Sequence, residues 1–78
     1  MLGQRVEPET YPLKPGDYVR RAEGWYGMSP NGLLANLNAH KVSEHRDGSI
    51  SVEPSILVKD GQGSQWHGYL TAGVWTEC

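Results

Sequence analysis

The stretch AHKVSEHRDGSISV, residues 39–52, decides the predicted fold of this chain. Apolar and polar residues alternate from Ala39 to His45, and they alternate again from Ile50 to Val52. A period of two places successive side chains on opposite faces of a β-strand. Between the two segments, Arg46-Asp47-Gly48 is typical of a tight turn, because glycine adopts the positive φ that such turns require. The stretch therefore predicts a β-hairpin.

Further strands are expected on both sides of this hairpin. Residues 17–21 combine strand-forming residues with polar neighbours, as a half-buried strand does. After the hairpin, Pro54 interrupts the ladder because it has no N–H to donate, and it marks a bend before the apolar residues 56–58. Residues 66–70 and 74–75 then predict a last pair of strands, joined through a turn at Gly73.

Two segments depart from this pattern. Ser29 and Pro30 are typical of a helix N-cap and first helical position, and the leucines at 33, 34 and 37 follow at helical spacing. Residues 1–15 contain three prolines and no apolar period, which predicts an extended N-terminal arm. The expected fold is mainly β. It is a small single-domain antiparallel β meander in residues 16–78, with one short helix and the arm at residues 1–15.

Length and charge exclude several classes of protein. Seventy-eight residues allow one small hydrophobic core. Seven Lys and Arg against nine Asp and Glu give a net charge of −2, which does not favour binding to nucleic acid. A membrane-spanning helix needs about 20 consecutive apolar residues, and no stretch of this chain approaches that length. The first ten residues contain no apolar block of the kind that a signal peptide has. A cytoplasmic protein without a membrane partner is expected, and its oligomeric state stays open.

No metal or other cofactor is expected. The single cysteine, Cys78, cannot form an internal disulfide or a thiolate zinc site. His40 and His45 are five residues apart on one predicted strand, so their side chains point to opposite faces. Packing against a neighbouring strand or exposure to solvent is the simpler role for both.

Ser55 and His67 are the candidate catalytic residues. A serine at a break in a strand can expose its hydroxyl to substrate, and His67, between Trp66 and Gly68, is the candidate general base. Asp47 is the candidate carboxylate that orients this base. Regular pairing places Ser55 opposite Leu70 or Tyr69, several residues from His67, so contact requires the bend at Pro54 to fold Ser55 back. Turn formation by the serine and packing of the histidine are the competing roles.

The aromatic residues are candidates for binding a partner protein. Trp25, Tyr26, Trp66 and Tyr69 are of the types that dominate the energetics of protein interfaces. The chain has no Phe, however, and aromatic side chains are also needed to fill its core. Exposure of two or more of them on one face would favour the binding role.

Three motifs resemble those of a family of short phage and prophage proteins. They are GWYGMSPNG at residues 24–32, DGSISV at 47–52 with PSI at 54–56, and WHGYL at 66–70 with GVW at 73–75. More distantly, the chain is similar to a cysteine-containing bacterial family that binds zinc. Its members often neighbour ubiquitin-like proteins and E1-type activating enzymes in defence operons.

The resemblance implies a metal-free protein, because Met28-Ser29-Pro30-Asn31 stands where the distant relatives place cysteines in this loop. The Pro54-Ser55 pair and His67 do match, and they imply either a shared hydrogen bond or a shared catalytic pair. The catalytic alternative is a small phage-type Ser/His hydrolase, or serine peptidase, in the host cytoplasm. It would act on peptide or ester bonds, with ubiquitin-like conjugates as the substrates that counter-defence implies. The other alternative is a non-catalytic phage accessory or virion-associated module that binds a host or phage protein.

The first prediction is that the fold needs no metal. Thermal melts with and without a chelator should coincide, because the chain lacks the cysteine ligands on which structural zinc sites depend. A drop of many degrees on chelation, with zinc found by elemental analysis, would contradict this prediction.

Overall fold

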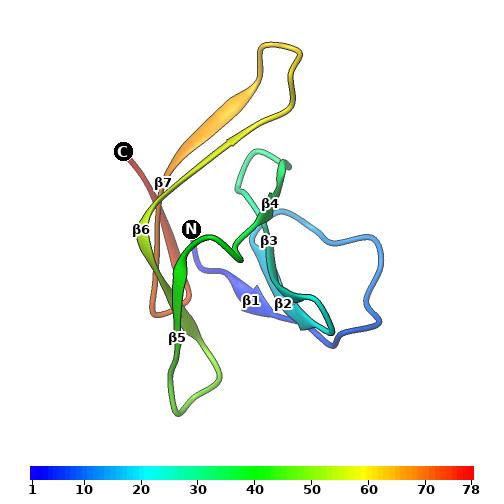
Figure 1. Cartoon of the computed structure of the whole chain (residues 1–78), viewed down its shortest axis with the longest axis vertical. Coiled ribbons are helices and arrows are strands. Elements are labelled where there is room, and N and C mark those ends of the chain that lie inside the picture. Colours follow the sequence, from blue (N-terminus) through cyan, green and yellow to red (C-terminus); the bar gives the residue numbers. More distant parts are fainter.

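Eight β-strands and no helix make up the computed structural model, which describes residues 1–78 (Figure 1). The strands are β1 (Gln4–Arg5), β2 (Asp17–Arg21), β3 (Gly24–Met28), β4 (Leu34–Asn36), β5 (Lys41–Glu44), β6 (Ile50–Lys59), β7 (Gln65–Thr71) and β8 (Val74–Glu77). They form two four-stranded sheets, ordered β1-β2-β3-β4 and β5-β6-β7-β8. Neighbouring strands are antiparallel except for the pair β1 and β2. The prediction of a small, mainly antiparallel β domain is confirmed.

The predicted hairpin is confirmed as the pair β5–β6. Glu44 pairs with Ile50, and Gly48 has a φ of 90° in the turn between them. The Gly48 N–H donates to the His45 carbonyl oxygen at 2.9 Å, and the His45 N–H donates to the Ser49 carbonyl oxygen at 2.8 Å. These bonds set the register that places Ile50 and Val52 in the core.

The predicted helix after Pro30 is wrong. The Ser29 hydroxyl does accept the Leu33 N–H at 2.9 Å, as a cap would, but this bond closes a single turn. The chain then pairs with β3 as the edge strand β4. Ala35 and Leu37 are buried while Leu34 is 53% exposed, so burial follows a period of two. Pairing with β3 overrides the helical spacing of the leucines, because it buries alternate residues against both sheets.

The first six residues connect the two sheets through backbone hydrogen bonds to both. Met1 exchanges two backbone hydrogen bonds with Trp75 in β8, and the Gly3 N–H donates to the Gly73 carbonyl oxygen at 2.7 Å. Beyond them, the Val6 N–H donates to the Tyr18 carbonyl oxygen in β2 at 3.0 Å. The N-terminal segment therefore links β8 of one sheet to β2 of the other, and Figure 1 shows it between the two groups of strands.

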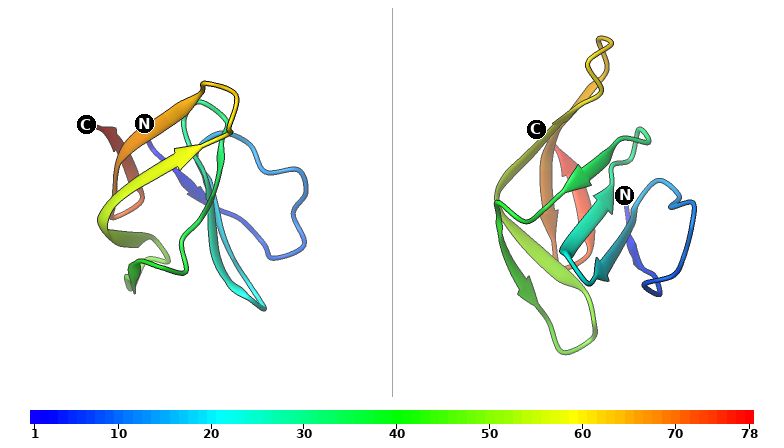
Figure 2. Two further views of the ribbon diagram at one scale, coloured as in Figure 1. Left: turned by 45° about the horizontal axis from the view of Figure 1, so that its top comes forward. Right: turned by 45° about the vertical axis from the view of Figure 1, so that its right-hand side comes forward.

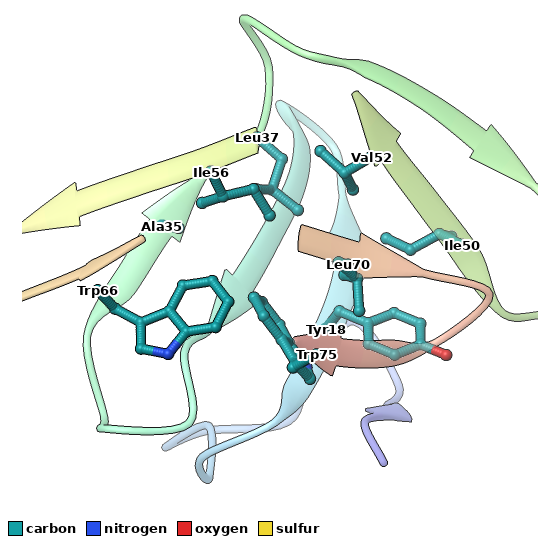
Figure 3. Packing of buried hydrophobic residues seen from close by; sticks show 9 residues of the cluster. All are labelled: Tyr18, Ala35, Leu37, Ile50, Val52, Ile56, Trp66, Leu70 and Trp75. Atoms are coloured by element: carbon teal, nitrogen blue, oxygen red, sulfur yellow. The ribbon is translucent and has the colours of Figure 1, made fainter. Parts of the chain in front are cut away.

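The core lies between the two sheets and is built around two tryptophans (Figure 3). The Trp66 and Trp75 rings meet edge to face, with centroids 5.4 Å apart and planes at 80°. The Trp75 indole N–H donates to the Gly16 carbonyl oxygen at 3.0 Å, which ties β8 to the start of β2. The nine residues of the cluster are Tyr18, Ala35, Leu37, Ile50, Val52, Ile56, Trp66, Leu70 and Trp75.

The hairpin of β6 and β7 projects beyond the rest of the molecule (Figure 2). At its tip, the Asp60 carboxylate accepts the N–H groups of Gln62 and Ser64 at 2.7 and 3.1 Å. The chain has no helix of the length and apolarity needed to cross a membrane.

The second prediction concerns Gly68, which is buried in β7. A Cβ atom there would collide with the Thr76 carbonyl oxygen and lie 2.5 Å from the Trp66 ring. Gly68→Ala should lower the free energy of unfolding by about 2 kcal/mol, because neither neighbour can move without disturbing the core. Gln65→Ala, at an exposed position of the same strand, should change it by less than about 0.5 kcal/mol. Equal denaturation midpoints for the two variants in urea would contradict this prediction.

Candidate functional site

A bulge in β6 positions the candidate nucleophile. Val52 pairs with Leu70 and Ile56 pairs with Gly68, so the three residues 53–55 of β6 stand opposite Tyr69 alone. The bulge contains Pro54, which has no N–H and interrupts the ladder, as the sequence predicts. Ser55 therefore leaves the regular ladder at the point where the outer face of the sheet is open to solvent.

Ser55 and His67 are in hydrogen-bond contact. The Ser55 Oγ lies 3.0 Å from the His67 Nε2. Leu57 is the direct partner of His67, so Ser55 is its diagonal neighbour on the same outer face, within reach of an imidazole. The two residues are thus one diagonal apart rather than several residues along the ladder.

The contact has the geometry of a nucleophile and its base. When the Ser55 hydroxyl donates to Nε2, the ring hydrogen resides on Nδ1, and the lone pair on Nε2 is available to accept the hydroxyl proton. Ser55 is half-buried and His67 is exposed, so a substrate can approach from solvent.

A shallow hollow of about 410 Å³ adjoins Ser55 on this face. Tyr69 of β7 also lines this hollow, opposite the bulge in β6, and its side chain is 48% exposed. Four of its lining residues carry a hydroxyl group, and one, Glu53, carries a carboxylate. The hollow is lined by Ser51, Val52, Glu53, Pro54, Ser55, Tyr69 and Thr71.

Asp47 is not brought to His67. It lies in the β5–β6 turn, at the opposite end of β6 from the residues that pair with His67. Its Oδ1 accepts the hydroxyl and the N–H of Ser49 at 2.6 and 2.9 Å, and these two bonds lower the pKa of the carboxyl. Asp47 closes its own turn, and it does not orient the candidate base.

Asp47 instead lines a larger cleft of about 790 Å³ between the N-terminal segment and the hairpin turns. Tyr18 lies in its wall, and burial, followed by the nearby Asp47 charge, raises the pKa of the Tyr18 phenol. Arg5 stands at the same cleft, where it forms an ion pair with Glu44 and lies 5.0 Å from the centre of the Trp25 ring. Sequence reasoning missed Arg5, because its partners are distant along the chain and no local pattern marks it.

The candidate binding aromatics do not share an exposed face. Trp66 is 4% exposed and belongs to the core, so it has almost no surface to offer a partner. Trp25 and Tyr26 are half-buried neighbours in β3. Of the four residues, Tyr69 alone is largely exposed, and it lies beside the Ser55 hollow.

The three histidines occupy separate places. His45 Nε2 shares a hydrogen bond of 2.7 Å with the Ser51 hydroxyl, whereas His40 Nε2 contacts the Ser55 carbonyl oxygen at 3.2 Å. No three His, Cys, Asp or Glu side chains converge as they do around a metal ion. The contact of His40 with the Ser55 carbonyl oxygen was not predicted, because the sequence pattern places His40 on a strand, whereas it lies in the turn before β5.

Comparison with models of protein families, with curated proteins and with solved structures finds no match to this chain. The resemblance to phage proteins and to the zinc-binding family therefore stays a prediction, and the site is interpreted from its own geometry.

Proposed function

We propose that this chain is a small serine hydrolase in which Ser55 is the nucleophile and His67 is the general base. The observation that carries the proposal is the 3.0 Å contact between the Ser55 Oγ and the His67 Nε2. In the reaction, Oγ attacks the carbonyl carbon of an ester or amide while its proton passes to Nε2. The proton then goes to the departing alcohol or amine, and water hydrolyses the acyl-serine with His67 again as the base.

Esters are favoured over amides as substrates. A carboxylate that orients the histidine contributes about 10⁴-fold to the turnover of serine proteases. Asp47 is engaged by Ser49, and no side chain hydrogen bonds to the His67 Nδ1. A pair without this carboxylate has less power to expel an amine, so we expect ester and activated acyl bonds to be cleaved fastest. Backbone N–H groups at the bulge are the candidate donors to the oxyanion.

The shape of the site favours an extended substrate that lies on the outer face of β6 and β7. The hollow of about 410 Å³ next to Ser55 has room for a short segment of chain, and its walls carry hydroxyl groups and the Glu53 carboxylate. A ubiquitin-like protein in the host cell, as the resemblance implies, would present its C-terminal acyl group in such a segment, and an ester or thioester linkage at that group is the kind that this pair would cleave fastest. Hydrolysis of that bond by a phage protein would remove a defence mark.

A non-catalytic role as a phage accessory or virion-associated module is the second candidate. Leu57 is 53% exposed and Tyr69 is 48% exposed, and both lie on the face that carries His67. Tyrosine is one of the residue types that contribute most to protein interfaces when a partner covers them. This role predicts binding without turnover.

The third prediction separates these two roles. A fluorophosphonate probe should label the wild-type protein, and peptide mapping should place the label on Ser55, because only a serine activated by a base reacts at neutral pH. Ser55→Ala and His67→Ala should abolish labelling. Ser43→Ala, at another half-buried position of the same sheet, should leave it unchanged. Ser55→Ala should lower the free energy of unfolding by less than about 1 kcal/mol, because the contact is exposed to solvent.

Two results would overturn the hydrolase. One is folded wild-type protein that neither reacts with the probe nor hydrolyses a p-nitrophenyl ester above the rate of Ser55→Ala. The other is a loss of roughly 1 to 3 kcal/mol in both Ser55→Ala and His67→Ala without any labelling, which would assign the pair a bracing role.

A further inference from the structure

His40, which is half-buried, contacts the backbone of the candidate nucleophile from the β5 side of the sheet. It follows the end of β4, where its N–H donates to the Leu37 carbonyl oxygen at 3.0 Å and closes a tight turn. From this turn its imidazole reaches β6, where the Nε2 lies 3.2 Å from the Ser55 carbonyl oxygen. Ser55 is therefore held by two histidines, at its carbonyl by His40 and at its hydroxyl by His67.

The protonation of His40 follows from its partners. A carbonyl oxygen only accepts hydrogen bonds, so the Nε2 of His40 must carry the hydrogen. The Nδ1 of the neutral ring is then an acceptor, and it is buried with no hydrogen-bond partner. A buried polar atom without a partner destabilises a fold, and such atoms are uncommon in native proteins. An apolar side chain would avoid this cost, which indicates that the N–H donated to Ser55 is what the position requires.

The bulge explains why Ser55 needs this donor. Residues 53–55 stand opposite a single residue of β7, so the regular ladder does not hold Ser55 in place. Without a donor to its carbonyl, the Ser55 backbone is held only by the pairing that resumes at Ile56, and a shift of this backbone moves the Oγ away from His67. A misplacement of about 1 Å is enough to cost roughly 100-fold in the rate of an enzymatic step.

We infer that His40 is a positioning residue, which fixes the backbone of Ser55 so that its hydroxyl points at the His67 Nε2. This inference rests on the proposed function for its catalytic meaning, but the geometry that it describes is measurable without turnover. In this role His40 acts only through the Ser55 carbonyl group and takes no part in the chemistry itself.

The fourth prediction compares His40→Phe with His40→Gln. Phenylalanine keeps a planar ring of similar size but removes the donor, whereas glutamine supplies an amide N–H. We expect His40→Phe to slow labelling of Ser55 by the fluorophosphonate about 10- to 100-fold, and His40→Gln to recover part of that loss. His45→Phe is the matched control, because His45 bonds to the Ser51 side chain instead, and it should label at the wild-type rate.

A second measurement keeps the test independent of hydrolase activity. The ring ¹⁵N shifts of His67 should change in Ser55→Ala, which removes the hydroxyl that Nε2 contacts, and the same change should occur in His40→Phe. The melting temperature of each variant shows whether it is folded. If His40→Phe is folded and retains wild-type His67 shifts, the positioning role is excluded whether or not the protein hydrolyses anything. If the shifts change but wild type never reacts with the probe, the positioning role stands and the hydrolase fails.

Discussion

The position of Trp75 is the constraint on which the rest of the structure depends. It is 2% exposed, its backbone pairs with Met1, and its indole N–H bonds to the Gly16 carbonyl oxygen at 3.0 Å. Its ring also packs edge to face on Trp66, and it passes so close to Gly27 that a Cβ atom there would lie 2.9 Å away. One residue thus joins the last strand of one sheet to the N-terminal segment through its backbone, and to the start of β2 and to β3 through its side chain. In a chain with so little apolar surface, two tryptophans contribute much of the buried area that holds the sheets together.

The candidate site follows from this core. Because side chains alternate along β7, burying Trp66 directs His67 to the outer face. On the neighbouring strand, Ile56 must point inward as part of the same core, so the bulge leaves Ser55 on the outer face beside His67. The contact between Ser55 and His67 is therefore a consequence of how the strands pack.

A domain of this size has few residues with which to build support around a site. The structure meets this need with side chains that reach across from other elements, as His40 does to the Ser55 carbonyl group. Arg5 makes a similar long-range contact at the larger cleft. Its side chain bonds to Glu44 and to the Gly48 carbonyl oxygen, and so joins the N-terminal segment to the β5–β6 hairpin. Contacts of this kind make both sites depend on the complete fold.

The sequence by itself determined the β class and the β5–β6 hairpin with its positive φ at Gly48, and it predicted Ser55 and His67 as the candidate catalytic residues. Each of these rests on local chemistry, such as the period of two, the turn preference of glycine and the missing N–H of Pro54. Only the tertiary structure decided that residues 34–36 form a strand, that Asp47 lies at the opposite end of β6 from the partner of His67, and that His40 reaches Ser55. These outcomes depend on which strands become neighbours and on a register shifted by the bulge. Contacts between distant segments set both, so no local pattern of residues encodes them.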